Sequence, residues 1–425
     1  MNVYKYPDPD TWEEIVKRPL MDTASLESTV QAVLADVKQD GDEAVRKYTL
    51  KFDKASFSDL LVTEAEIEAA VSAVDAVLKA AIGQAKDNIE KFHAAQRDEV
   101  RVIETMPGVA CWRKSVPVEK VGLYIPGGTA PLFSTILMLA IPARLAGCRE
   151  IILCTPPDSA GKINPVMLYA ARLTGVTKIY KIGGVQAIAA MAYGTGSVPK
   201  VNKIFGPGNQ YVTCAKQLVN RQGTAIDMPA GPSEVAVLAD ESCVPAFVAA
   251  DLLSQAEHGI DSQVLLVTTD EKVVEAVEAQ ISVQLEALPR KNIAAQALSA
   301  SKAVVVKDLE MAVGLVNAYA PEHLILACKN DQDVADRILN AGSVFLGNHS
   351  PESVGDYASG TNHTLPTNGF ASAYSGVSLD SFVRKITYQR LSPEGLALIA
   401  PIVAEMAAAE GLEAHKRAVT IRTSH

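Results

Sequence analysis

The chain contains two successive patterns of apolar and polar residues. Up to about residue 120, apolar residues recur at helical spacing, most clearly over 25–51 and 64–96, with Gly41-Asp42 as a possible break in the first stretch. From Val121 onward, short apolar runs alternate with helical patterns of roughly 10–15 residues. This second pattern is typical of βαβ units, so it predicts parallel sheets covered by helices.

The alternation forms two successive blocks. In the first block we expect strands near 121–125, 150–154, 178–182, 201–205 and 224–228, with helices near 132–147, 164–174, 185–193 and 209–221. In the second block we expect strands near 234–239, 263–268, 303–307, 323–327 and 343–347. The stretch 348–376 is rich in Gly, Ser, Asn and Thr and predicts a loop, and an Ala-rich helical tail is expected from Ser392.

These blocks predict an α/β protein with two incomplete, doubly wound Rossmann-like domains of mostly parallel sheet. A length of 425 residues also favours two or three domains. We expect residues 1–20 to form an N-terminal extension and 377–425 a helical C-terminal tail. We expect 122–232 to form an inserted Rossmann-like domain. Residues 21–121 and 233–376 would then form one discontinuous αβ domain around it.

The composition limits the class of protein. Hydrophobic residues make up 48% of the chain and charged residues 21%, which argues against disorder. The net charge of -10 argues against a nucleic-acid or anionic-membrane surface. The sequence contains neither a signal-peptide pattern nor an apolar run long enough to span a bilayer. The six cysteines are scattered without a Cys-x-x-Cys pair, which favours reduced thiols. We therefore expect a cytoplasmic enzyme.

Three glycine-rich loops follow predicted strands of the first block. They read Ile125-Pro126-Gly127-Gly128, Ile182-Gly183-Gly184 and Phe205-Gly206-Pro207-Gly208-Asn209. Ligands of open parallel sheets bind outside the carboxyl ends of the strands, and glycine lets phosphates approach the backbone and the next helix N-terminus. The standard Gly-x-Gly-x-x-Gly is absent, because Tyr211 stands where its third Gly is needed, and so is a Walker A lysine. The loops are therefore either tight turns or an unusual nucleotide site, and three on one edge favour the site.

A second group of residues has the donor atoms of a metal site. Gln255 and His258 are three apart at the end of a predicted helix, which places both side chains on one face. Asp356 and His415 can complete a nitrogen and oxygen set that suits Zn²⁺ and does not exclude Mn²⁺ or Co²⁺. The spacing alone is also compatible with a local helix cap.

Glu322 and His323 stand together at the entrance of a predicted strand. Such a pair can serve as acid and base, since imidazole titrates near neutral pH and a carboxylate tunes it. A capping Glu and a hydrogen-bonded core His are the alternative. His363 is in a polar loop and would otherwise be an ordinary surface residue.

Longer motifs resemble those of the histidinol dehydrogenase family, over about residues 21–420. They are Val121-Gly122-Leu123-Tyr124-Ile125-Pro126-Gly127-Gly128, Phe205-Gly206-Pro207-Gly208-Asn209, Asp227-Met228-Pro229-Ala230-Gly231-Pro232-Ser233-Glu234, Leu252-Leu253-Ser254-Gln255-Ala256-Glu257-His258, Pro321-Glu322-His323-Leu324, Gly355-Asp356-Tyr357-Ala358-Ser359-Gly360-Thr361-Asn362-His363, and Ala409-Glu410 with Ala414-His415-Lys416. No departure from the family pattern is present at these positions.

The resemblance implies an NAD-dependent, zinc-containing enzyme that oxidises L-histidinol to L-histidine through L-histidinal, the last step of histidine biosynthesis. It implies His323 as the base and Glu322 as the group that activates water. It implies one Zn²⁺ per subunit, bound by Gln255, His258, Asp356 and His415. The implied NAD contacts are Tyr124, Gln186 and Asn209. The implied substrate contacts are Ser233, His363 and Glu410 together with the metal ligands and the Glu322–His323 pair.

The resemblance also implies a homodimer with shared active sites, in which the C-terminal segment reaches into the partner's pocket with Glu410 and His415.

Three other interpretations of the function stay open. A relative on the same scaffold can oxidise another small alcohol, such as a sulfonated diol, although such a substrate would not need His363 and Glu410. A metal-dependent hydrolase would act without NAD. A non-catalytic binding protein would be indifferent to His323→Ala.

Overall fold

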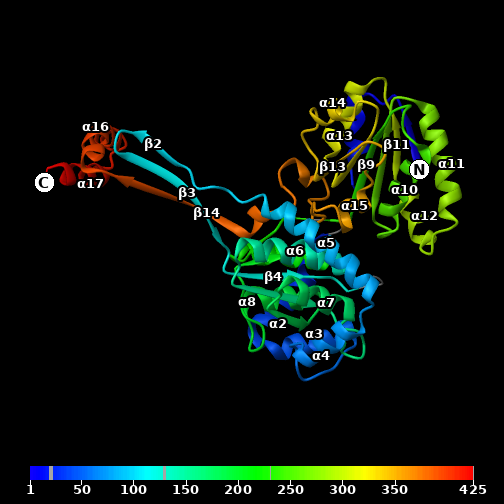
Figure 1. The fold of residues 1–425 in the computed structure, drawn as a ribbon, viewed down its shortest axis with the longest axis horizontal. Helices are drawn as coiled ribbons and strands as arrows, with labels where there is room; N and C mark the ends of the chain where they lie inside the picture. The colour runs from blue at the N-terminus through cyan, green and yellow to red at the C-terminus, as the bar shows by residue number, and fades with distance from the viewer. Residues whose placement is uncertain (19–22, 128–130, 230, 425) are drawn as a thin grey trace.

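Two parallel sheets and a projecting arm make up the molecule (Figure 1). The structure is a computed structural model and describes residues 1–18, 23–127, 131–229 and 231–424. The expected domain boundary at residues 20–21 lies outside these residues, as do Gly128 and Ala230 of the expected motifs. The expected α/β class with mostly parallel sheets and a helical C-terminus is confirmed. No helix in the described part of the chain is long and apolar enough to cross a membrane.

The first sheet contains five parallel strands in the order β6-β5-β4-β7-β8. The strands are β4 (Lys120–Tyr124), β5 (Glu150–Thr155), β6 (Lys178–Lys181), β7 (Lys203–Phe205) and β8 (Ala225–Ile226). The connecting helices are α6 (Phe133–Ala146), α7 (Pro165–Thr174), α8 (Gly184–Tyr193) and α9 (Gln210–Arg221). The chain runs outward from β4 to β6 and then returns to β7 on the other side of β4. A crevice therefore opens at the carboxyl edge of the sheet, where ligands of such sheets bind.

The second sheet contains six parallel strands in the order β1-β11-β10-β9-β12-β13. They are β1 (Asn2–Lys5), β9 (Glu234–Ala239), β10 (Gln263–Thr268), β11 (Lys302–Val305), β12 (His323–Ala327) and β13 (Ser343–Leu346). Its helices are α1 (Trp12–Val16), α10 (Pro245–Ala256), α11 (Glu271–Leu285), α12 (Lys291–Ala300), α13 (Leu309–Tyr319), α14 (Asp331–Ala335) and α15 (Glu352–Tyr357), with 3-10 turns η1 (Pro9–Thr11), η2 (Phe370–Ser372) and η3 (Leu379–Phe382) elsewhere. Strands β9, β10 and β12 are buried along their whole length, as the continuous apolar runs of a covered parallel sheet require.

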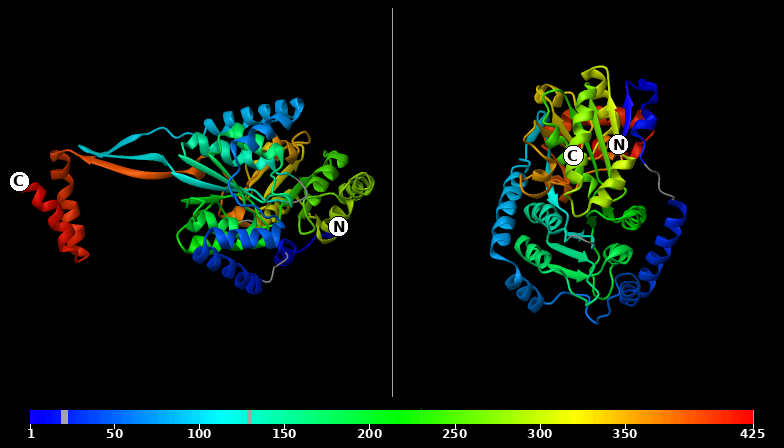
Figure 2. Two further views of the ribbon diagram at one scale, coloured as in Figure 1. Left: turned by 90° about the horizontal axis from the view of Figure 1, so that it is seen from below. Right: turned by 90° about the vertical axis from the view of Figure 1, so that its right-hand side faces the viewer.

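The N-terminal helices pack differently from the expectation. They are α2 (Thr23–Asp40), α3 (Asp42–Asp53), α4 (Glu64–Ala73) and α5 (Ala76–Ala94). Val37 shares a buried core with Ile188 of α8, and Ile89 shares one with Met138 of α6, so these helices cover the first sheet rather than the second (Figure 2). Helical periodicity shows that a helix has an apolar face, but it does not show which sheet that face covers. The N-terminal extension also differs, because β1 pairs with β11 and extends the second sheet.

The arm was not expected from the sequence. Strands β2 (Val102–Met106), β3 (Val109–Pro117) and β14 (Val383–Leu391) form a three-stranded antiparallel ribbon. Strands β2 and β3 lie in the stretch 21–120, which is expected to be mainly helical, and β14 lies in the expected helical tail 377–425, so both expectations are wrong at these residues. The helices α16 (Pro393–Ala409) and α17 (Glu413–Thr423) stand at its far end, away from both sheets (Figures 1 and 2). The strands of the arm are largely exposed, so they lack the clean apolar alternation that reveals a half-buried strand.

Candidate active site

A small pocket of about 150 Å³ lies where the carboxyl edge of the first sheet meets the amino edge of the second. Gly206 and Pro207, which follow β7, line one side. Ser233, which precedes β9, and His323, which begins β12, line the other. The pocket brings together most of the predicted site residues, namely Ser233, Gln255, His258, Glu322, His323, Asp356 and His363. Segments more than a hundred residues apart in the sequence thus share one pocket.

The predicted acid–base pair is buried at the start of β12. The Glu322 Oε2 atom accepts a hydrogen bond from the backbone N–H of Glu234 at 2.9 Å and lies 3.6 Å from Nδ1 of His323. His323 Nδ1 lies 3.2 Å from the backbone oxygen of Glu234, so this nitrogen is placed to donate. The other nitrogen, Nε2, is buried without a hydrogen-bond partner and lies 3.4 Å from Oδ1 of Asp356. The imidazole is therefore held at Nδ1, and Nε2, which faces Asp356, is the nitrogen that can exchange a proton in the pocket.

Burial and neighbouring charge oppose each other in this pair. Burial raises the pKa of Glu322 to about 8, although the charge of His323 works against this. Burial alone would lower the pKa of His323, but the negative charges of Glu322 and Asp356 outweigh it and raise that pKa to about 10. Titratable groups with displaced pKa values in one pocket are typical of acid–base sites.

His363 is held in a fixed orientation. Its Nδ1 lies 2.7 Å from the backbone oxygen of Asp356, and its Nε2 lies 3.0 Å from the hydroxyl of Thr135 at the start of α6. Burial lowers the pKa of His363. These contacts fit a neutral imidazole that donates from Nδ1 and accepts at Nε2. His363 is therefore held in place by its neighbours in the pocket where the family resemblance expects it, and Thr135 is a pocket residue that no motif in the sequence indicates.

Gln255, His258 and Asp356 have the donor atoms of a cation site. Gln255 lies in the last turn of α10 and is 1% exposed, yet neither its Oε1 nor its Nε2 has a hydrogen-bond partner. Asp356 Oδ1, on α15, is likewise buried without a hydrogen-bond partner, and its nearest charged neighbour is His323 Nε2 at 3.4 Å. Buried polar atoms without partners are costly, so their convergence fits a ligand that the protein is built to receive. Oxygen and nitrogen donors beside a helix C-terminus favour a divalent cation.

The expectation that Gln255 and His258 share one face of a helix is wrong. Helix α10 ends at Ala256, and His258 follows in a turn whose backbone N–H donates to the oxygen of Gln255 at 3.2 Å. His258 therefore reaches the pocket from the turn and is exposed, rather than sharing a helix face with Gln255. In the described residues, no three His, Cys, Asp or Glu side chains gather closely enough to hold a metal ion.

Glu410 and His415 are not brought to this pocket. Both are exposed residues of the tail, Glu410 at the end of α16 and His415 in α17. Figure 1 shows that the arm holds this tail far from both sheets of the same chain. Within one chain, the predicted ligand and substrate sets are therefore incomplete.

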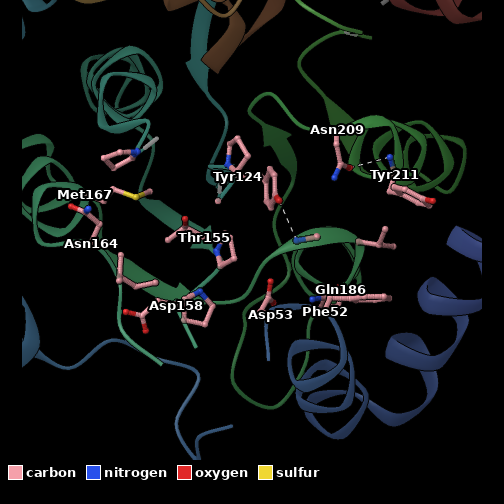
Figure 3. A pocket seen from close by; sticks show the side chains of 18 of the residues that line it. Phe52, Asp53, Tyr124, Thr155, Asp158, Asn164, Met167, Gln186, Asn209 and Tyr211 are labelled. Carbon is pink, nitrogen blue, oxygen red and sulfur yellow. Dashed lines mark hydrogen bonds between the residues drawn. The ribbon is translucent and has the colours of Figure 1, made fainter. Parts of the chain in front are cut away.

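The predicted NAD residues line a second, larger cavity of about 1100 Å³ (Figure 3). Tyr124, Gln186 and Asn209 all contribute to its wall. The Tyr124 hydroxyl accepts from the backbone N–H of Gly184 at 3.1 Å, and Asn209 Oδ1 caps α9 by accepting from Tyr211 N at 3.1 Å. Gln186 is buried, and both of its amide atoms lack partners. The cavity lies along the carboxyl edge of the first sheet, as the glycine loops predicted.

The glycine loops serve packing as well as access. Gly206 has φ +122°, and a Cβ atom there would lie 1.9 Å from the backbone oxygen of Tyr124. At this position glycine is required by the close approach of two chain segments. The tight-turn reading is therefore right for Gly206, and the loop lines the small pocket at the same time.

A buried ion pair beneath this loop was missed. Lys216 Nζ lies 2.5 Å from Oδ1 of Asp227 and donates to the backbone oxygen of Gly206 at 2.8 Å. The other carboxylate oxygen of Asp227 accepts from the N–H of Gly206 at 2.8 Å. The pair therefore fixes Gly206 from both sides. A lysine among the apolar positions Val212 and Val219 of the helical pattern was the available signal.

Comparison with known proteins gives a consistent result. The histidinol dehydrogenase family profile matches residues 16–423. A histidinol dehydrogenase of Bacteroides fragilis is 63% identical over 422 residues, covering 99% of this chain and 99% of its own. One from Salmonella typhimurium is 52% identical over 419 residues, covering 98% and 96%. The crystal structure of histidinol dehydrogenase from Elizabethkingia anophelis matches with a TM-score of 0.98 at 55% identity, covering 100% of this chain and 98% of that one. This chain belongs to the histidinol dehydrogenase family of oxidoreductases.

Proposed function

We propose that this chain catalyses the four-electron oxidation of L-histidinol to L-histidine through L-histidinal, the last step of histidine biosynthesis. Each turnover would reduce two NAD⁺, and each subunit would hold one Zn²⁺. Membership of the family supports the substrate and the pathway. The observation that carries the mechanism is the buried Glu322–His323 pair beside unpartnered metal-type donors, next to a cavity of about 1100 Å³.

In the first oxidation, His323 acts as the base. Its Nε2 takes the hydroxyl proton of the alcohol while the hydride leaves the same carbon for NAD⁺, which yields the aldehyde and NADH. The base must be neutral, so its contact with Asp356 has to be released or neutralised first. Asp356 is itself a predicted metal ligand, and a cation bound there would withdraw the negative charge that raises the pKa of His323.

In the second oxidation, Glu322 acts on water. Its carboxylate takes a proton from a water molecule whose oxygen adds to the aldehyde carbon, while the protonated His323 returns its proton to the aldehyde oxygen, which gives the hydrate and a neutral His323. His323 then takes a hydroxyl proton of the hydrate while a second hydride leaves for a second NAD⁺. The product is the carboxylic acid, which ionises. One water and two NAD⁺ are consumed, and two NADH are formed for each histidinol.

The same pocket has room for one small substrate. Ser233, His363 and the pair Glu322–His323 line it, so they are placed to hold the substrate's polar groups. Zn²⁺ would be held by Gln255, His258 and Asp356 with His415 of the partner subunit, and would supply a fixed template for the substrate's nitrogen atoms. The orphaned amide of Gln255 and the orphaned Oδ1 of Asp356 fit this set.

The substrate and metal sets are completed by dimerisation. Helix α16 presents Leu398, Ile402 and Met406, which are 52%, 50% and 61% exposed and lie four residues apart on one face. An exposed apolar row of this kind favours burial against another chain. Exchange of the tails between two subunits would cover this row and bring the partner subunit's Glu410 and His415 to each pocket. All six cysteines are free, which fits the expected cytoplasmic location.

The test is the amount of NADH formed per L-histidinol, on protein stripped with a chelator and then restored with Zn²⁺. Two NADH per substrate, lost on stripping and regained with zinc, support the proposal. One NADH indicates a simple alcohol dehydrogenase and overturns the role of Glu322. Activity that needs zinc but no NAD⁺ indicates the hydrolase instead.

A further inference from the structure

Asp53 is a carboxylate of the large cavity that the proposed chemistry does not use. It is the last residue of α3, and its Oδ2 atom is shielded from solvent without a hydrogen-bond partner. An acidic residue at a helix C-terminus faces the negative end of the helix dipole, and a buried oxygen without a partner adds to that cost. Both costs are relieved if a ligand in the cavity donates hydrogen bonds to this side chain (Figure 3).

The position of Asp53 assigns it to one end of the cavity. Its Oδ1 lies 3.3 Å from where a Cβ atom would stand on Gly183, the residue just before α8 in the loop that follows β6. Asn209 and the small pocket lie beyond β7, on the other side of β4. A dinucleotide whose nicotinamide reaches the small pocket near Asn209 must therefore extend past β4 and β5 toward Asp53. Its adenosine half lies at the Asp53 end.

The position that usually holds the ribose in a Rossmann-type sheet is occupied differently here. That position follows the second strand of the sheet, and in this chain the acid after β5 is Asp158. Its Oδ1 already accepts from the N–H groups of Ala160 and Lys162, each at 2.9 Å. Asp158 is therefore engaged in its own turn, whereas Asp53 enters the cavity from a helix outside the sheet.

We propose that Asp53 accepts hydrogen bonds from the hydroxyl groups of the adenosine ribose of NAD⁺, and that its charge excludes the 2′-phosphate of NADP⁺. The proposal rests on the NAD-dependent function above. Phe52, which precedes it and is 52% exposed, lines the same wall and offers an aromatic face to the adenine. Among the described residues of the cavity wall, Asp53 and Asp158 are the acids and Lys162 is the only cation, so the wall is poorly suited to an added phosphate.

The experiment compares Asp53→Asn with the matched control Asp158→Asn. For Asp53→Asn we expect the KM for NAD⁺ to rise about tenfold or more, since a hydrogen bond to a charged group is lost. The kcat should stay within about twofold, because the reacting carbon lies at the other end of the cofactor. The preference for NAD⁺ over NADP⁺ should shrink. Asp158→Asn should change the KM for NAD⁺ by less than about twofold.

An NAD⁺ analogue that lacks the 2′-hydroxyl of the adenosine ribose separates contact from structure. Wild type should lose affinity for the analogue by a factor similar to that of the substitution, and Asp53→Asn should lose little more. If the variant and wild type discriminate equally against the analogue, Asp53 does not touch this ribose and the proposal is wrong. Failure of wild type to form any NADH would instead refute the proposed function.

Discussion

The two parallel sheets contribute opposite edges to the two pockets of the molecule. The first sheet presents its carboxyl edge, where strands end and helices begin, and there lies the cavity of about 1100 Å³ lined by glycine loops. The second presents its amino edge, where Ser233 precedes β9 and His323 begins β12, and there lies the pocket of about 150 Å³ with buried ionisable groups. One edge offers space and backbone N–H groups. The other offers titratable side chains.

This difference has an electrostatic cause. Helix N-termini cluster at the carboxyl edge of a parallel sheet and favour anions such as a pyrophosphate. At the amino edge, helices such as α10 end, and their C-termini favour a cation. Gln255 lies in the last turn of α10 and His258 just beyond it. Two copies of one architecture, joined edge to edge, therefore supply the two environments that the proposed metal-assisted hydride transfer needs.

The largest effect is expected at the amino edge. His323→Ala should lower kcat by about 10³-fold, because the base that accepts the hydroxyl proton is lost. The KM for NAD⁺ should change little, since His323 does not line the large cavity. Steady-state kinetics with varied NAD⁺ check this. An unchanged kcat would contradict the assignment of chemistry to this edge.

The next largest effect is expected in the free energy of unfolding, at the buried Lys216–Asp227 ion pair beneath the loop at Gly206. Lys216→Met leaves Asp227 buried and unpaired, which is expected to cost about 3–5 kcal/mol in free energy of unfolding. Denaturant unfolding measures the loss, and Lys200→Met, at an exposed lysine of the same domain, is the control. Equal stabilities for the two variants would show that the ion pair does not fix the loop at Gly206.

We expect the proposed metal ligands to come from two subunits. His258→Ala and His415→Ala should each reduce activity about 100-fold or more, as losses of metal-site residues do. Co-expression of the two variants should restore about a quarter of the wild-type activity, because half of the mixed dimers' sites receive neither substitution. Recovery is judged against each variant alone. Without any recovery, the two residues would belong to one chain's site.

The smallest effect is expected at the carboxyl edge, and it depends on pH. Burial raises the pKa of Asp53 to about 6, so the free carboxylate gains its proton as the pH falls through that value. If ribose hydroxyls bind the charged form, NAD⁺ affinity is full above about pH 7 and falls roughly tenfold by pH 5. Calorimetric titration with NAD⁺ in the absence of substrate measures this. Asp53→Asn should show a flat profile in the same range.

The sequence predicted the two sheets closely because their strands are continuous apolar runs between helices. Strands β9, β10 and β12 have the expected bounds of 234–239, 263–268 and 323–327. The arm could not be predicted, since β2 and β14 are mostly exposed and lack apolar alternation. The N-terminal helices were predicted as helices but not in their packing, which depends on contacts distant in sequence.

Residues of the small pocket were predictable where local motifs carry them. Glu322, His323, Gln255 and Asp356 lie in short polar stretches of an apolar chain, and the structure gathers them in one pocket. Thr135 and Asp53 stand at the ends of ordinary helical patterns, so only the folded chain reveals what they face. Glu410 and His415 stand on a tail away from the pocket of their own chain, so their placement depends on contacts beyond one chain.

The arm has a consequence for dynamics. Strands β3 and β14 pair along nine residues each, from Val109 with Leu391 to Pro117 with Val383. This ribbon is a single layer without a core of its own, and such ribbons are only marginally stable in water. Its backbone amides should therefore exchange their hydrogens quickly in a lone subunit and slowly once another chain covers them. Under the proposed exchange of tails, the hydrogen-exchange rate of the ribbon would then measure the fraction of subunits whose pockets are complete.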